Sequence, residues 1–437
     1  MADIRPFRGI HYNQSLIKDI STVICPPYDI ISPQLRQDLY QRSQHNFVRL
    51  EYSRELPQDT ATDNKYTRSA ATLEQWLNAN ILMRDQAPAI YLHNHYFTYQ
   101  GKEYKRRGMI ARVRLEEWEK MVIRPHEGTL SEPKTDRLSL LWALQANTSP
   151  VLALFEDEGG VSSVLQAQEK TEPMIGLSGY DGERHYVWAI NEPGEIDRIC
   201  GSLANKPLYI ADGHHRYESA LTYQRERRNY LQSTTSEDAF NFVMMTLVDF
   251  SDPGLMILPP HRLVRGIPKT TLNALTSRLE SFFEIDMVPA STPGVWQQVD
   301  DLLRHGQVSQ DRLVIFGLMP EHLLVLTVRD LDAAKEMMPY FHGELYKRFI
   351  VSIVDHIILE RILGLSITSE ESVLAYSYDR QDAVNKVLDQ EYQLALLLSP
   401  VKAEQIKAIA DAGDRMPRKS TYFYPKAPAG LVLYRLF

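Results

Sequence analysis

The sequence predicts an α+β protein, and three patterns carry that prediction. Apolar and polar residues alternate over 89–99 and 104–113 on either side of a Gln-Gly-Lys turn, which is typical of a β-hairpin. The apolar run 208–211 ends in Asp-Gly and continues at helical spacing, which predicts a strand, a turn and a helix. Residues 268–338 show the periodicities of helix, strand, helix, strand and strand in turn.

The length of 437 residues predicts several domains, because a chain of this length normally forms more than one hydrophobic core. An apolar strand at 23–31 is interrupted by Pro26 and Pro27, and Ser32 with Pro33 is typical of a helix start. A boundary is predicted near Arg265, and 344–363 is predicted as one long amphipathic helix. The predicted division is an N-terminal α/β segment (1–85), a core (86–265), an auxiliary α+β module (266–343) and a C-terminal α/β lobe (344–437).

Composition and charge narrow the class of protein. Hydrophobic residues make up 44% and charged residues 24%, as in an ordinary folded protein. The net charge of -8 opposes unspecific attraction to nucleic acid, so nucleic acid is not an expected partner. With only Cys25 and Cys200, a disulfide framework and a four-cysteine zinc site are excluded. We expect a cytoplasmic protein without a membrane partner, since no signal core or membrane-spanning run is present, and the oligomeric state is left open.

The most informative motif is Asp-Gly-His-His-Arg, residues 212–216, at the predicted strand-to-helix junction. The free N–H groups in the first turn of a helix favour binding of an anion, and Arg216 could add bidentate hydrogen bonds to phosphate oxygens. The other interpretation is that Asp212 only caps the helix and that His214 and His215 are ordinary exposed residues. The motif therefore predicts a phosphate site, with helix capping as the alternative.

A second polar cluster is Arg-Pro-His-Glu at 124–127, followed by Gly128. Glu127, directly after His126, could act as a general base if its pKa were raised, whereas the motif alone would fit a solvated turn equally well. A base together with a phosphate-binding turn is what a phosphotransferase needs. Magnesium bridging the nucleotide phosphates is the expected metal, with Asp212 as the nearest carboxylate.

These two motifs together resemble the ParB/sulfiredoxin superfamily and, within it, the archaeal free-serine kinases. The resemblance implies a ParB/sulfiredoxin-like core, Glu127 as the base on the substrate hydroxyl, and ATP or ADP bound by the 212–216 turn. His126 and Asp212 join Glu127 as candidate catalytic residues, and Gly213, His214, His215 and Arg216 are the candidate nucleotide-binding residues.

Over nearly its full length the chain also resembles the bacterial domain of unknown function 1015 family. Three motifs carry this resemblance: Pro-Phe-Arg-Gly at 6–9, Pro-Pro-Tyr-Asp at 26–29 and Lys-Ser-Thr-Tyr-Phe-Tyr-Pro-Lys at 419–426. In the last motif, Lys419 and Lys426 could reach a phosphate, and the aromatic residues between them fit a core strand better than a stacking platform.

Other interpretations are weaker. His93 and His95 share one face of the predicted hairpin, but the histidine spacings lack the tight pattern of a zincin helix. Asp136, Arg137 and Asn147 could line the same cleft or brace loops. Sulfiredoxin-type chemistry is disfavoured because it needs a reactive cysteine where this chain has histidines.

The sequence therefore predicts a nucleotide-dependent phosphotransferase that acts on a small hydroxyl substrate, with free L-serine as the leading candidate. The alternative is a ParB-like regulator that binds or hydrolyses CTP or ATP without a small-molecule acceptor. A DNA-binding or nuclease-like member of the superfamily is disfavoured by the net charge and by the lack of a clear helix-turn-helix pattern.

Overall fold

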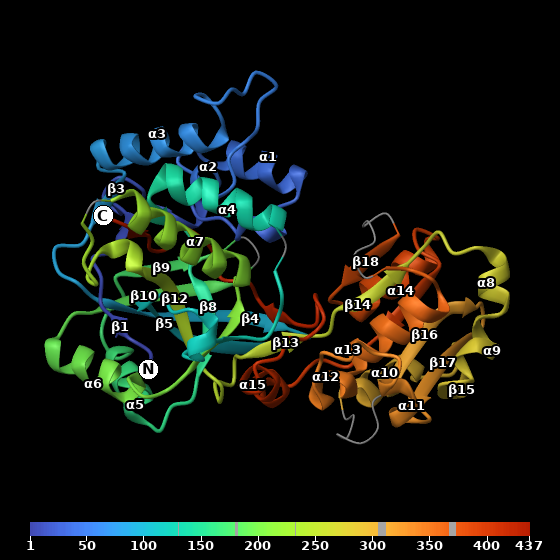
Figure 1. Cartoon of the computed structure of the whole chain (residues 1–437). Helices are drawn as coiled ribbons and strands as arrows, with labels where there is room; N and C mark the ends of the chain where they lie inside the picture. Colours follow the sequence, from blue (N-terminus) through green and yellow to red (C-terminus); the bar gives the residue numbers. More distant parts are fainter. Residues whose placement is uncertain (130, 180–181, 232, 305–311, 367–372) are drawn as a thin grey trace. The chain divides into compact units, whose positions relative to one another are not determined.

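The computed structural model describes residues 1–129, 131–179, 182–231, 233–304, 312–366 and 373–437 (Figure 1). The chain forms two compact units of mixed helices and sheets, which confirms the predicted α+β class. The chain passes from the first unit to the second between Met256 and Ile257, and the finer division into four segments stays a prediction. Unit 1 comprises 1–125, 129–256 and 425–437, and unit 2 comprises 126–128 and 257–424.

Unit 1 is built on a mixed sheet in which the described strands follow the order β6-β11-β8-β12-β5-β4-β10-β9, with β1 paired to β5. The predicted hairpin is confirmed as β4 and β5, which pair in antiparallel register from Tyr91 with Ile110 to Tyr99 with Lys102. Gln100 and Gly101 in the turn both have positive φ, as a tight hairpin turn requires. The strands are β1 (Ile4–Arg5), β4 (Ile90–Tyr99), β5 (Lys102–Arg114), β6 (Ile123–Pro125), β8 (Val151–Phe155), β9 (Ile175–Ser178), β10 (Arg184–Ile190), β11 (Leu208–Asp212) and β12 (Phe242–Asp249), with β2 (Ile10–Tyr12), β3 (Leu82–Arg84), β7 (Ala146–Asn147) and β21 (Tyr434–Arg435) in two small two-stranded sheets.

Helices cover the sheet of unit 1, with α4 and α7 on one side and α5 and α6 on the other (Figure 1). Ser32 caps α1 as predicted, because its side chain accepts a hydrogen bond from the backbone N–H of Leu35 and Pro33 occupies the first turn. The helices are α1 (Pro33–Arg42), α2 (Val48–Glu51), α3 (Lys65–Asn78), α4 (Ser131–Leu144), α5 (Gly160–Gln168), α6 (Pro193–Leu203) and α7 (His214–Tyr230), with 3-10 turns at Ile20–Thr22, Tyr28–Ile30, Trp118–Lys120 and Ala239–Asn241.

The segment 23–33, predicted as an apolar strand broken by a proline-rich turn, contains the turn but almost no strand. Only Cys25 forms a β-bridge there, with Ala429, and Tyr28–Ile30 is a 3-10 turn. Pro26 and Pro27 have no N–H to donate to a neighbouring strand, so a ladder cannot continue through them. The segment therefore follows an irregular path, with Tyr28 and Asp29 in the turn.

Unit 2 contains a second sheet, in the order β15-β17-β16-β19-β14-β18 for the described strands. Strands from the predicted auxiliary module adjoin strands from the predicted C-terminal lobe in it, since β16 pairs with β19. These two parts of the sequence therefore share one sheet. The strands are β14 (His261–Val264), β15 (Phe283–Pro289), β16 (Arg312–Met319), β17 (His322–Val328), β18 (Leu374–Ser377) and β19 (Leu394–Leu397), while β13 (Met256–Leu258) lies where the chain enters unit 2 and β20 (Tyr422–Tyr424) lies near its end.

The single long helix predicted over 344–363 is wrong. Phe349 adopts an extended backbone and separates α12 from α13, after which the chain becomes π-helical over Val354–Ile362. In that segment Asp355 accepts two hydrogen bonds, each 3.1 Å, from the guanidinium of the fully buried Arg262, so a buried ion pair lies at the π-helical stretch. The helices of unit 2 are α8 (Lys269–Asn273), α9 (Leu275–Leu279), α10 (Val295–Arg304), α11 (Leu331–Lys335), α12 (Glu344–Arg348), α13 (Ile350–Ile353), α14 (Arg380–Leu388) and α15 (Ala403–Asp411).

A search of the described helices for a membrane span finds none with the required length and apolar character.

Candidate functional site

The predicted strand, turn and helix around 212–216 are confirmed. β11 ends at Asp212, Gly213 adopts a left-handed backbone with φ of 91°, and α7 begins at His214. The register of β11 against β8 shifts between Ile210 and Asp212, and such an irregularity changes the direction of the residue that follows it. The free N–H groups of the first turn of α7 therefore follow directly after Asp212 in the chain.

Asp212 pairs with two cations. Its Oδ2 accepts a hydrogen bond of 2.6 Å from Nη2 of Arg216, and its Oδ1 pairs with Nζ of Lys426. The N-cap of α7 is Gly213, and no side-chain hydrogen bond caps this helix. Asp212 therefore does more than a helix cap would require, because it pairs with two cationic side chains.

The charge of Asp212 follows from these partners. Burial by itself would raise the pKa of this carboxyl, but Lys426, Arg216 and the nearby His214 outweigh that effect and lower the pKa well below its usual range. Asp212 is therefore ionised at neutral pH. It holds Arg216 and Lys426 in place but is too weak a base to accept a proton from a hydroxyl group.

Arg216 is fixed from a second direction, because its Nη1 donates a hydrogen bond of 2.5 Å to the carbonyl of Pro150. A Cβ atom on Gly213 would lie 2.9 Å from Nε of Arg216. Glycine at this position thus permits both the left-handed backbone and the close packing of the guanidinium. A guanidinium has five N–H donors, so the two bonds above leave donors for a phosphate group.

The Pro-Pro-Tyr-Asp motif contributes to the same region of unit 1. Asp29 lies 3.7 Å from Nζ of Lys426, and the guanidinium of Arg137 lies 4.0 Å from the ring centre of Tyr28. Burial raises the pKa of the Tyr28 hydroxyl to about 12, with smaller opposing effects of Arg137 and Arg216 and raising effects of Asp29 and Asp212. Tyr28 is therefore a neutral hydroxyl near the turn.

Asp29 and Tyr28 were not predicted as site residues, although the family motif that contains them was visible in the sequence. Lys426 was predicted only as able to reach a phosphate. The remaining family motif, at 6–9, has structural contacts instead: the N–H of Gly9 donates to the hydroxyl of Tyr91 at 2.7 Å.

The polar residues of α4 and β7 lie near the turn but mainly brace it. Arg137, Arg216 and Asn147 line a cavity of about 30 Å³, which has room for about one water molecule. Asn147 accepts a hydrogen bond of 2.8 Å from the N–H of Met244, and Asp136 accepts bonds from Arg137 and Tyr66. These contacts favour the bracing interpretation for Asp136 and Asn147.

The predicted catalytic pair His126 and Glu127 belongs to unit 2. Oε1 of Glu127 accepts a hydrogen bond of 2.7 Å from the N–H of Lys419. His126 is fully buried, its Nε2 lies 3.0 Å from Oγ1 of Thr421, and its carbonyl accepts a bond of 2.7 Å from the N–H of Met416. The motif at 124–127 is therefore fixed by hydrogen bonds and is not a loosely solvated turn.

The motif at 419–426 contacts both predicted site motifs, each within one unit. In unit 2 the backbone of Lys419, which has a φ of 56°, bonds Glu127. In unit 1 the side chain of Lys426 pairs with Asp212. A family motif near the end of the sequence thus supplies a partner to each of the two polar motifs.

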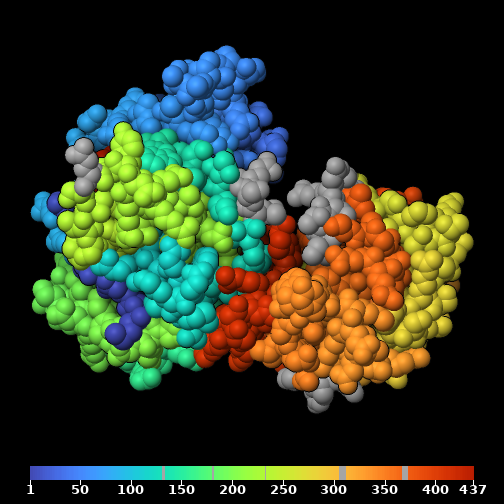
Figure 2. All heavy atoms as spheres, in the orientation of Figure 1, coloured from blue at the N-terminus to red at the C-terminus, as the bar shows by residue number. Residues whose placement is uncertain are grey.

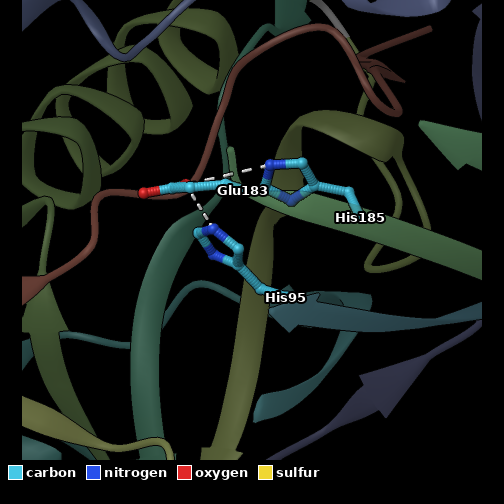
Figure 3. Close-up of side chains that lie close together, drawn as sticks. All are labelled: His95, Glu183 and His185. Atoms are coloured by element: carbon cyan, nitrogen blue, oxygen red, sulfur yellow. Dashed lines mark hydrogen bonds and ion pairs between the residues drawn. The ribbon is translucent and has the colours of Figure 1, made fainter. Parts of the chain in front are cut away.

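A further polar cluster in unit 1 joins three strands, and Figure 3 shows three of its side chains, His95, Glu183 and His185. We define the histidine cluster as His93, His95, His185, Glu183 and Arg106. His95 is in register with His185 on one neighbouring strand and with Arg106 on the other. Sequence reasoning placed His93 and His95 on one face but missed the other members, because they come from separate strands.

Hydrogen bonds assign the tautomers of the histidine cluster. Nδ1 of His95 faces Nη2 of Arg106 at 3.1 Å, and because a guanidinium can only donate, this nitrogen accepts. Nε2 of His95 therefore carries the proton and donates to Glu183 at 2.5 Å. Burial lowers the pKa of all three histidines, with further lowering by Arg106, and the pKa of His185 falls to about 3. All three rings are neutral at pH 7.

The spacing of this cluster would admit a metal ion, since ligand atoms of His95, Glu183 and His185 lie within 4.8 Å of one another. A metal on Nε2 of His95 would require the proton to move to Nδ1, where it would face the N–H of Arg106. Two donors would then oppose each other. The cluster therefore fits a hydrogen-bonded core better than a metal centre.

The fold and the charged turn define an α+β protein with a candidate anion site at a strand-to-helix junction. A comparison with protein families shows the family to which the chain belongs. The family model described as "Protein of unknown function (DUF1015)" matches residues 4–351, and the chain belongs to this family, as its motifs predicted.

Comparisons with individual proteins give weaker similarities. No curated protein matches the sequence. Among solved structures, the chain is similar to a free serine kinase in complex with AMP, with 12% identity, a TM-score of 0.35, and coverage of 76% of this chain and 93% of that one. It is also similar to a conserved hypothetical protein from Pyrococcus furiosus, with 11% identity, a TM-score of 0.33, and coverage of 76% and 97%. At these low TM-scores, what the site binds has to follow from the chain's own residues.

Proposed function

We propose that the 212–216 turn binds the phosphates of ATP or ADP and that the protein transfers the terminal phosphoryl group to a small hydroxyl substrate, with free L-serine as the leading candidate. One observation carries the proposal: an ionised carboxylate holds two cations, Arg216 and Lys426, at the N-terminus of the long helix α7. A phosphate there would meet the dipole of the helix, its first N–H groups and two positive side chains.

In the proposed transfer, the oxygen of the substrate hydroxyl attacks the terminal phosphorus, and the bond from that phosphorus to the leaving nucleotide oxygen breaks. The hydroxyl proton passes to the carboxylate of Glu127. Arg216 and Lys426 neutralise the charge on the phosphate oxygens, which is the main requirement for this reaction. His214 and His215 belong to the proposed nucleotide site through the first turn of α7, and His126 positions Glu127 through its backbone.

The proposal includes Glu127 and Asp212 in one reaction, with Glu127 as the base and Asp212 holding the two cations. Glu127 follows β6 and Asp212 ends β11, and in this parallel pair of strands Pro125 is in register with Ile210.

Magnesium at Asp212 has less support. Both carboxylate oxygens of Asp212 already bond cationic side chains. They could not also bind a magnesium ion without rearrangement. No step above depends on the ion, and its omission from the assay tests the requirement directly.

The test is a coupled assay of the purified full-length protein with ATP or ADP, serine and magnesium. We expect acceptor-dependent turnover that falls roughly a hundredfold or more in Glu127→Gln, as for the loss of a general base. Arg216→Ala should mainly weaken nucleotide binding. Arg225→Ala is the matched control, because Arg225 lies on the same helix, pairs with the exposed Glu117 and is itself mostly exposed.

Turnover that neither Glu127→Gln nor Arg216→Ala changes would refute the assignment of the site. Tight nucleotide binding by the wild-type protein without any serine-dependent turnover would instead favour the nucleotide-binding regulator. A set of other small hydroxyl compounds in the same assay distinguishes a wrong acceptor from a wrong reaction class.

A further inference from the structure

A cavity of about 830 Å³ in unit 1 is lined by none of the residues of the 212–216 turn. It is bounded by α1, α2, α3 and the segment that follows α2, all in the N-terminal part of the chain, which forms the blue surface at the top of Figure 2. Four arginines line it: Arg36, Arg49, Arg54 and Arg68. We call it the arginine cavity.

Tyr40 organises two of these arginines. The guanidinium carbon of Arg49 lies 4.2 Å from the centre of the Tyr40 ring, and that of Arg54 lies 4.0 Å from it. The Tyr40 hydroxyl accepts a hydrogen bond of 3.1 Å from the backbone N–H of Arg54 and lies 3.2 Å from the hydroxyl of Ser53. Two like charges are thus held against one aromatic ring, a cation–π arrangement that orients them at the wall of the cavity.

The positive charge in the arginine cavity is largely uncompensated. Arg68 pairs with Asp59 and Asp63. Among the described residues, no carboxylate lies within ion-pair distance of Arg36, Arg49 or Arg54. The one acidic side chain in the lining, Glu55, pairs instead with Lys65.

Arg49 also has unused hydrogen-bonding capacity. Its Nη2 donates to the carbonyl of Tyr40 at 3.1 Å, but its buried Nε has no hydrogen-bond partner in the described part of the chain. A buried donor without a partner destabilises the fold, and it does so more strongly when it is charged. Burial lowers the pKa of Arg49, and the nearby charge of Arg54 lowers it further against an opposing effect of Tyr40. An anion bound beside Arg49 and Arg54 would offset the repulsion between their two guanidinium groups.

We propose that the arginine cavity binds a small molecule through a phosphate group that Arg36, Arg49 and Arg54 hold. Guanidinium groups match phosphate oxygens in bidentate geometry, and the cavity volume lies in the range of small-molecule sites. Thr72 and Gln37 in the lining supply neutral hydrogen-bonding groups for the rest of the ligand. This site is separate from the proposed phosphotransferase function and does not depend on it.

The test is isothermal titration calorimetry of the full-length protein with three probes: inorganic phosphate, glucose 6-phosphate and glucose. We expect binding of at least one phosphate-bearing probe, no binding of glucose, and weaker binding at higher salt. Tighter binding of glucose 6-phosphate than of inorganic phosphate identifies a phosphorylated organic ligand, and the reverse identifies the free anion.

Arg54→Gln and Arg36→Gln should each weaken the binding roughly tenfold or more, as expected for the loss of a charge-assisted hydrogen bond. The guanidinium carbon of Arg36 lies 5.0 Å from the centre of the Tyr52 ring, and no ion pair of Arg36 occurs among the described residues, so its variant keeps the proposal testable if Arg54→Gln fails to fold. Arg198→Gln, on the exposed face of α6, is the matched control and should bind like the wild type.

Absence of binding by both phosphate probes, or binding that both arginine variants leave unchanged, would overturn the proposal. Arg216→Ala separates it from the phosphotransferase function: this variant should leave phosphate-probe binding at the arginine cavity intact whether or not it abolishes nucleotide binding.

Discussion

Unit 1 contains two groups of largely buried titratable side chains. One group keeps its charge at neutral pH, and the other is kept neutral. At the 212–216 turn, Asp212 stays charged because Arg216 and Lys426 offset the cost of its burial. In the histidine cluster, burial and Arg106 keep His93, His95 and His185 neutral. The charge of a buried group thus depends on the sign of its neighbours as much as on its burial.

The difference has a functional consequence. The turn concentrates fixed charges and N–H donors beside a helix N-terminus, so it is prepared for a charged ligand. In the histidine cluster, His95 accepts a hydrogen bond from Arg106 and donates one to Glu183, so the cluster ties the strands β4, β5 and β10 together without offering a site for an ion. We therefore expect substitutions at the turn to affect ligand binding and substitutions in the cluster to affect stability alone.

The largest expected effect is that of Asp212→Asn. It removes the carboxylate and leaves two cations side by side, which should lower the free energy of unfolding by about 3–5 kcal/mol. Urea unfolding followed by circular dichroism measures the change. Asp197→Asn, on the exposed face of α6, is the control with the same change of charge.

Adding Lys426→Met to Asp212→Asn should restore part of the lost stability, because one of the two opposed cations is then gone. If Asp212→Asn and Asp197→Asn had equal effects, the buried ion pairs would contribute nothing and the contrast with the histidine cluster would fail.

The second expected effect is a loss of stability in weak acid caused by the histidines. The folded-state pKa of His185 is about 3, whereas the unfolded value is about 6.5, so the unfolded state binds a proton first as the pH falls. The stability is fully present above pH ~6.5 and declines below it, by about 2 kcal/mol at pH 5 from His185 alone. His93 and His95 act in the same direction.

Urea unfolding at a series of pH values between 7 and 5 measures how the free energy of unfolding changes with pH, and this dependence is the slope to compare between variants. His185→Gln should flatten it, whereas His322→Gln, on β17 of unit 2, should not. An unchanged slope in His185→Gln would mean that this histidine is not kept neutral by the fold.

The smallest expected effect separates backbone strain from side-chain crowding. Gly213 and Gly101 both have positive φ, but a Cβ on Gly101 would meet no atom within 4 Å, whereas one on Gly213 would meet Arg216. Gly101→Ala should therefore report strain alone, about 1–2 kcal/mol, and Gly213→Ala should cost more and also weaken nucleotide binding. Thermal unfolding and nucleotide titration of both variants give the comparison. Equal losses of stability in Gly101→Ala and Gly213→Ala would show that Arg216 is not held closely over Gly213.

Much of the local structure was readable from the sequence because it depends on neighbours along the chain. The hairpin of β4 and β5, the cap at Ser32 and the junction at 212–216 follow from alternation, capping and glycine patterns within a few residues. The same reasoning overestimated the strand before the proline-rich turn within 23–33, because the prolines prevent a ladder. It failed at 344–363, where Phe349 breaks the helical periodicity that the apolar residues suggest.

The sequence by itself determined the α+β class, the family and the position of the charged turn, since each depends on short motifs and their local periodicity. The tertiary structure alone decided which charges meet. Lys426 reaches Asp212, and Glu183 and Arg106 flank His95, from points far apart in the sequence. The physical reason is that electrostatic partners are chosen by distance in space, and that distance is set by how strands pair in the sheet and not by spacing along the chain.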